Sequence, residues 1–198
     1  MKGLLLKDIG VGKIILFVLP LLGLYSLLSE VMTFMPIGLA ALIPLSVLGN
    51  DYVTKWNKLE PMMPVRPSVL VVEKYLVSAL CMLFGLVIFI LCTVISHEFL
   101  HRSVTLGILI PQLIIIITIA ILMVDISLPL LFLVKSQTAH LVIIFISAGL
   151  VGGLFTTIVS IAEKVGSSSF LLGCLAAVIL ITAGSIALSM LFYRRKDK

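Results

Sequence analysis

The feature that most limits the fold of this chain is a series of long apolar segments, the longest of which covers residues 104–134. A spanning helix needs roughly 20 mostly apolar residues to cross about 30 Å of hydrocarbon. The chain is 61% hydrophobic and 12% charged, so it has too few polar side chains to cover the surface of a soluble domain. We therefore predict an all-α membrane protein.

Six segments are predicted to span the membrane as one helical bundle. They cover residues 14–29, 31–48, 75–96, 104–134, 139–161 and 170–193. The fourth segment is too long for one perpendicular helix, so it must tilt, protrude or break. Asp125 and Pro129 mark the expected break, and there Asp125 is interpreted as the cap of a restarted helix at the interface. A functional role for this carboxylate within an apolar segment is the alternative.

The basic residues predict the orientation of the bundle. If the N-terminus is cytoplasmic, all 14 Lys and Arg residues except Arg102 and Lys164 lie on the inside. This asymmetry places both termini in the cytoplasm. Residues 1–198 then form one transmembrane domain, with residues 1–13 as an interfacial segment and residues 50–74 as a cytoplasmic loop. The net charge of +5 reflects this topology, so no nucleic-acid partner is expected.

A possible metal motif follows the third predicted span. His97, Glu98 and His101 form HEFLH, the spacing at which two imidazoles on one helical face hold zinc beside a glutamate base. A catalytic zinc usually takes a third protein ligand. Asp125 and His140 are predicted to lie toward the other membrane surface, so neither supplies it. We favour a solvated loop with no metal, and keep an intramembrane zinc metalloprotease as an alternative.

Small residues mark possible sites of close helix contact. Gly149 and Gly153 have the spacing Gly-x-x-x-Gly, and Gly173 with Ala177 repeats it in the last span. These four residues are predicted to pack helices within the bundle or to form a subunit interface. Cys81, Cys92 and Cys174 all lie in apolar segments, so they are expected to be buried packing residues.

The loop before the third span carries a specific resemblance. Its matching positions are Lys55, Trp56, Met63, Pro64, Val65, Lys74, Tyr75 and Leu76. In this pattern the segment resembles the loop between the second and third spans of small bacterial type-2 ABC transporter permeases. The family usually has a basic residue three places after the proline, where this chain has Pro67, with Arg66 one place earlier. The segments MKGLLLKD and SLPLLF are also similar to the family.

The resemblance implies a permease domain that forms the export path of an ABC exporter in the bacterial cytoplasmic (inner) membrane. The loop would couple it to a separate ATPase subunit through residues Lys55, Trp56, Lys58, Glu60, Pro64 and Arg66. A second permease copy, identical or paralogous, would complete the path. ATP and Mg would bind the ATPase, and this chain, which has no Walker motif, would hold no cofactor and not be an enzyme by itself. A peptide or other hydrophobic or amphipathic substrate is expected, and a noncatalytic membrane scaffold is the remaining alternative.

Overall fold

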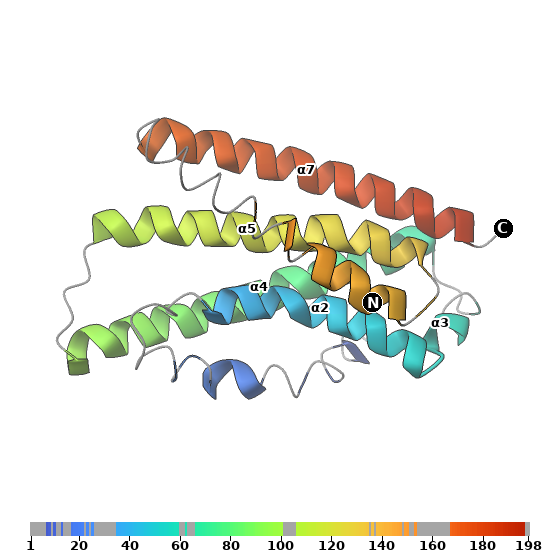
Figure 1. Cartoon of the computed structure of the whole chain (residues 1–198), viewed down its shortest axis with the longest axis horizontal. Helices are drawn as coiled ribbons and strands as arrows, with labels where there is room; N and C mark the ends of the chain where they lie inside the picture. Colours follow the sequence, from blue (N-terminus) through green and yellow to red (C-terminus); the bar gives the residue numbers. More distant parts are fainter. Residues whose placement is uncertain are drawn as a thin grey trace.

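The structure of the chain is entirely helical in the regular elements that are described. The computed structural model describes residues 7, 8, 10, 13, 17–21, 23, 25, 35–59, 62, 66–100, 106–134, 136, 138–147, 149, 150, 153 and 167–196. The helices whose two ends are both described are α2 (Met35–Val53), α3 (Trp56–Leu59), α4 (Pro67–Leu100), α5 (Leu106–Leu133) and α7 (Ser167–Lys196) (Figure 1). A shorter apolar helix covers Thr138–Ser147. The prediction of an all-α fold is thus confirmed for this part of the chain.

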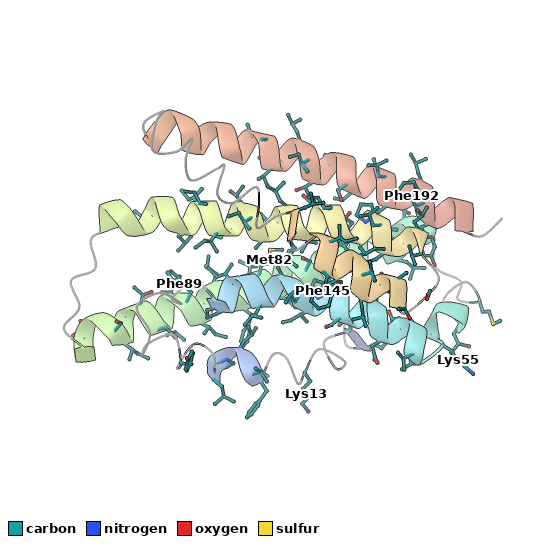
Figure 2. The ribbon with its side chains drawn as sticks, in the orientation of Figure 1. Lys13, Lys55, Met82, Phe89, Phe145 and Phe192 are labelled. Atoms are coloured by element: carbon teal, nitrogen blue, oxygen red, sulfur yellow. The ribbon has the colours of Figure 1, made fainter. Side chains whose placement is uncertain are left out.

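The long helices have the surface of a membrane protein. Ser68–Ser96 of α4, Leu113–Leu133 of α5 and Ala176–Tyr193 of α7 are each long and apolar enough to cross a bilayer. Large apolar side chains are exposed: Leu180 is 74% exposed, and Phe145, which is labelled in Figure 2, is 76% exposed. Hydrocarbon accommodates such a surface, whereas water does not. The chain is a multi-pass membrane protein. The predicted spans at residues 14–29 and 139–161 lie partly outside the described residues.

The described helices form a bundle with one main apolar core. Helix α5 packs along α7, and α2 packs against both α4 and α5 (Figure 1). The main cluster of buried side chains comes from α2, α4 and α5, with Tyr193 of α7. The Tyr193 ring meets Phe132 of α5 edge to face, with centroids 5.9 Å apart. This contact ties the C-terminal end of α7 to the C-terminal end of α5.

Helix α4 begins earlier than the sequence predicts. Its first residue is Pro67, whereas the predicted span begins at residue 75. Proline is well tolerated at the first helical position, because the N–H that it lacks would have no intrahelical partner there. The helix has 34 residues, so it extends about 50 Å, well beyond the hydrocarbon thickness. The predicted cytoplasmic loop of residues 50–74 is therefore helical at both ends. Its first residues belong to the end of α2, and its last residues form the first turns of α4.

Helix α5 is continuous where a break was predicted, so the interpretation of Asp125 as an interfacial cap is wrong. The helix runs through both Asp125 and Pro129. Proline lacks the N–H that would bond to the carbonyl of residue 125 in a regular helix. Ser185 of α7 supplies the missing donor, because its hydroxyl bonds to the Asp125 carbonyl at 2.6 Å. The neighbouring helix thus satisfies the carbonyl that proline leaves free, and the helix continues.

The closest helix contacts occur at glycines that the sequence analysis did not select. A Cβ atom on Gly85 of α4 would lie 2.8 Å from Cβ of Ala40 in α2, and one on Gly23 would lie 2.8 Å from the Ile88 side chain. By contrast, a Cβ on Gly149, Gly153 or Gly173 would meet no atom within 4 Å, and Ala177 is exposed. Within the described residues these four positions show no close helix contact, and their predicted role in bundle packing or at a subunit interface stays a prediction.

Candidate functional site

A cluster of buried charges lies at the end of the bundle that carries α3. Lys74 of α4 extends its ammonium to 2.5 Å from Asp8 Oδ2 and 2.9 Å from Asp51 Oδ2. Lys7 approaches the same two carboxylates, at 2.8 Å from Asp8 and 2.7 Å from Asp51. The carboxylate of Glu73 lies 3.9 Å from Lys74 Nζ. These five residues, which we call the charge cluster, join the N-terminal segment to the end of α2 and the start of α4.

Four of the five residues of the charge cluster are shielded from water, and Lys7 is partly exposed. The side chains of Asp8, Glu73 and Lys74 are 0%, 1% and 4% exposed. Burial raises the pKa of Asp8, but the charge of Lys74 and hydrogen bonds from Lys7 and Lys74 oppose it, so the pKa lies below its ordinary value. Removing one partner of such a buried set leaves an uncompensated charge, which is costly. The three chain segments are therefore held in one relative position.

Helix α3 is attached to the charge cluster through Trp56. The Lys7 ammonium lies 4.6 Å from the centre of the Trp56 ring, within the range of a cation–π interaction. The same ring packs against the main apolar core. Lys55 precedes it with φ of 58°, a left-handed conformation that ends the turn between α2 and α3. The short helix thus follows directly from α2 and lies against both the core and the cluster.

The predicted coupling residues divide into exposed and packed positions. Lys55 and Arg66 are exposed, and Figure 2 shows Lys55 pointing away from the bundle. Trp56 is half-buried. Lys58 belongs to α3, but its side chain lies outside the described residues, as do Glu60 and Pro64. The structure therefore brings Trp56 to the charge cluster and leaves two of the basic residues open to solvent.

A second polar region joins α4, α5 and α7. Because the single hydroxyl proton of Ser185 goes to the Asp125 carbonyl, Tyr75 must donate to Ser185, at 2.6 Å. Ser189 then donates to the Tyr75 oxygen, at 2.9 Å. The carboxylate of Asp125 is itself 2.6 Å from the hydroxyl of Thr182 in α7. Asp125 is thus buried within the bundle and is not at its end.

An open pocket lies beside this polar region. It has a volume of about 570 Å³, and its walls come mainly from α4, α5 and α7. Met82, labelled in Figure 2, lies on the α4 wall, and Ile121 and Ile179 lie on the α5 and α7 walls. Its polar lining consists of Tyr75, Ser78, Asp125 and Thr182. Asp125 therefore takes part in both the hydrogen-bond network and the pocket.

The predicted metal motif is only partly described. His97 and Glu98 lie in the last turn of α4, with Glu98 exposed, and His101 lies outside the described residues. The other two residues weighed as ligands have different neighbours. Asp125 pairs with Thr182, and Nε2 of His140 lies 3.2 Å from the Val134 carbonyl. No group of three or more possible metal ligands occurs among the described residues.

Sequence reasoning missed the charge cluster. Lys7 was placed in an interfacial segment, and Lys74 contributed to the predicted orientation and to the family resemblance, but neither was predicted to form an ion pair. The available signal was three acidic residues, Asp8, Asp51 and Glu73, close to the ends of apolar segments, where unpaired charges are costly. Their pairing could not be inferred, because it joins positions up to 66 residues apart in the sequence.

The comparisons with known proteins identify the family of the chain. Neither the curated proteins nor the solved structures gave a match. A family model described as "ABC-2 family transporter protein" matches residues 3–194, nearly the whole chain. That family comprises membrane permeases of ABC transporters, in agreement with the resemblance of the loop before α4. The chain therefore belongs to the ABC-2 transporter family, as a type-2 ABC transporter permease.

Proposed function

We propose that this chain is the transmembrane permease subunit of an ABC exporter that is driven by an ATPase on a separate polypeptide. The observation that carries the proposal is the family match over residues 3–194. Two copies of the permease, identical or paralogous, would form the export path. ATP and Mg would bind the ATPase, and this chain would hold no cofactor of its own. A peptide or other amphipathic molecule is the proposed substrate.

The proposed topology has six spans, with both termini on the cytoplasmic face of a bacterial inner membrane. Three parts of the chain that this topology places in the cytoplasm share one end of the bundle. Figure 1 places α3 and the C-terminal end of α7 there. The contacts of Lys7 with Asp51 place the N-terminal segment at the same end. The excess of Lys and Arg in these segments supports their assignment to the cytoplasm.

The proposed ATPase contact surface is α3 with its flanking turns. Lys55 and Arg66 are exposed and available to acidic groups of a partner. Lys58 and Glu60 complete the proposed polar contacts, and Pro64 would fix the angle of the segment. Closing of the ATPases on nucleotide would move α3 as a rigid body.

The charge cluster offers a route for that movement into the membrane. Trp56 contacts Lys7, and Lys7 shares two carboxylates with Lys74 of α4. A displacement of α3 would therefore shift α4 with it, because separating these buried charges is costly. In this proposal the exposed residues recognise the ATPase, and the buried residues transmit its motion.

The test is co-purification with an ABC ATPase encoded in the same genome, combined with ATP turnover. Lys55→Glu and Arg66→Glu reverse exposed charges and should weaken recruitment of the ATPase several-fold, with turnover falling in parallel. Lys13→Glu is the matched control, because Lys13 is equally a surface lysine but points away from the bundle at a distance from α3 (Figure 2). Unchanged recruitment and turnover in both variants would exclude this contact surface.

A further inference from the structure

The pocket between α4, α5 and α7 has the size and lining of a binding site. Its volume of about 570 Å³ falls within the range of roughly 300–1,000 Å³ typical of small-molecule sites. Most of the lining is apolar, including Met82, Leu86 and Ile121. The described side chains leave this space unfilled although they bury the core beside it. An apolar chain of moderate length would fit there.

Two polar groups in the pocket lack the partners that buried groups normally have. Ser78 is 2% exposed, and its hydroxyl has no hydrogen-bond partner in the described structure. A buried polar group without a partner is uncommon and calls for a bound water or ligand. Ser78 is one of the residues that line the pocket. This hydroxyl therefore points to an occupant with a hydrogen-bonding group.

The second group is the carboxylate of Asp125. The residue as a whole is 4% exposed. The hydroxyl of Thr182 lies 2.6 Å from this carboxylate and 2.9 Å from the Val178 carbonyl, so its single proton serves two acceptors. None of the ion pairs formed by the described residues includes Asp125. A buried carboxylate in its ionised form is costly in hydrocarbon unless a cation accompanies it. The charge cluster shows how this chain compensates such groups elsewhere, with two lysines. Among the described residues, no lysine, arginine or histidine lines the pocket.

We propose that the pocket binds one cationic amphiphile, with its apolar body between α4, α5 and α7 and its ammonium or guanidinium group at Asp125. The cation supplies the positive partner that the Asp125 carboxylate lacks among the described residues. An N–H of the same head group can donate a hydrogen bond to the Ser78 oxygen. The apolar walls select a hydrocarbon chain over a free cation. Binding at this site needs neither an ATPase nor transport, so it stands or fails independently of the proposed export function.

The test uses a dodecylamine that carries a diazirine on its chain, added to the full-length protein in phosphatidylcholine nanodiscs. Light should attach the probe saturably, about one per chain, to peptides of α4, α5 and α7 that line the pocket. Unlabelled dodecylamine should compete at least about tenfold better than dodecanol or dodecyl sulfate, because only the amine can pair with the buried carboxylate. Equal competition by dodecanol would reduce the site to a plain acyl-chain site and overturn the proposal.

Single substitutions test which side chains the binding of the amine depends on. Asp125→Asn retains the shape and an acceptor for Thr182, so the protein should fold, while the affinity for the amine should fall about tenfold or more. Ile121→Trp should fill the pocket and abolish labelling, whereas Leu130→Trp, on the same helix but outside the pocket, should not. Ser78→Ala should weaken amine binding with little effect on folding. Unchanged labelling of the Asp125→Asn variant by the amine probe would refute the proposal. Loss of labelling on association of two copies of the chain would refute it as well.

Discussion

The ammonium of Lys74 lies 2.5 Å from the carboxylate of Asp8, although 66 positions separate the two residues in the sequence. This contact joins the N-terminal segment to α4 beneath the surface of the bundle. Lys7 and Asp51 extend it to α2, and Trp56 extends it to α3. The proposed contact surface for the ATPase is therefore built on buried ion pairs, so mutations can separate recognition from transmission.

Lys74→Met should destabilise the protein strongly, because Asp8 and Asp51 would lose their shared buried cation. The expected loss is about 3–5 kcal/mol in the free energy of unfolding. Unfolding by SDS in mixed micelles measures this change. Lys13→Met is the control, since Lys13 is exposed and its loss should change stability by less than about 0.5 kcal/mol. Equal effects of the two variants would contradict the structural role of the cluster.

Glu73→Gln should have a much smaller effect than Lys74→Met. The cluster has three carboxyl groups and two ammonium groups, and the Glu73 oxygens accept no hydrogen bond in the described structure. Removing its charge relieves the excess of negative charge while keeping the shape, so we expect a change below about 1 kcal/mol. The same SDS titration checks it. A loss as large as that of Lys74→Met would mean that Glu73 is an essential partner.

Trp56→Ala should uncouple ATP turnover from transport without releasing the ATPase. The substitution removes the ring that contacts both Lys7 and the apolar core, but leaves Lys55 and Arg66 exposed. Binding of the ATPase should therefore persist while its stimulation by the permease falls. Trp56→Phe, which keeps an aromatic face for Lys7, should retain most of the stimulation. If Trp56→Ala instead loses the ATPase, Trp56 belongs to the contact surface.

Ser185 and Pro129 should be energetically coupled. Ser185→Ala leaves the Asp125 carbonyl without a donor, because Pro129 has no N–H to offer. In the Pro129→Ala background the backbone N–H of residue 129 restores that bond, so Ser185→Ala should cost less there. We expect a coupling energy of about 0.5–1.5 kcal/mol in a double-mutant cycle. Strict additivity of the two substitutions would show that Ser185 does not replace the lost bond.

Gly85→Ala and Gly149→Ala should differ sharply. The added Cβ at position 85 would lie 2.8 Å from Ala40 Cβ and 3.1 Å from the Pro36 carbonyl, so α2 and α4 must move apart. Overpacking of this kind costs about 1–3 kcal/mol. At Gly149 the Cβ meets nothing within 4 Å, so the folded monomer should keep its stability. A loss of dimer in Gly149→Leu, measured by crosslinking, would support its predicted place at a subunit interface.

Much of this protein could be predicted from local sequence. Long apolar segments require helices in a membrane, and the loop around Trp56 resembles the permease family to which the chain belongs. Both signals are carried by neighbouring residues, so they can be seen without any knowledge of packing. The helix limits were less accurate, because Glu73 and Lys74 interrupt the apolar pattern in the first turns of α4.

The places of the charged residues depended on contacts between distant segments. Sequence alone put Asp125 at a membrane surface because an acid and a proline usually end an apolar helix, but Ser185 of α7 satisfies the carbonyl that Pro129 leaves free, and the helix continues. The charge cluster likewise needs segments from three parts of the chain. A buried charge or a free carbonyl is acceptable only where another helix supplies its partner, and which helix faces it is set by the packing of the whole bundle.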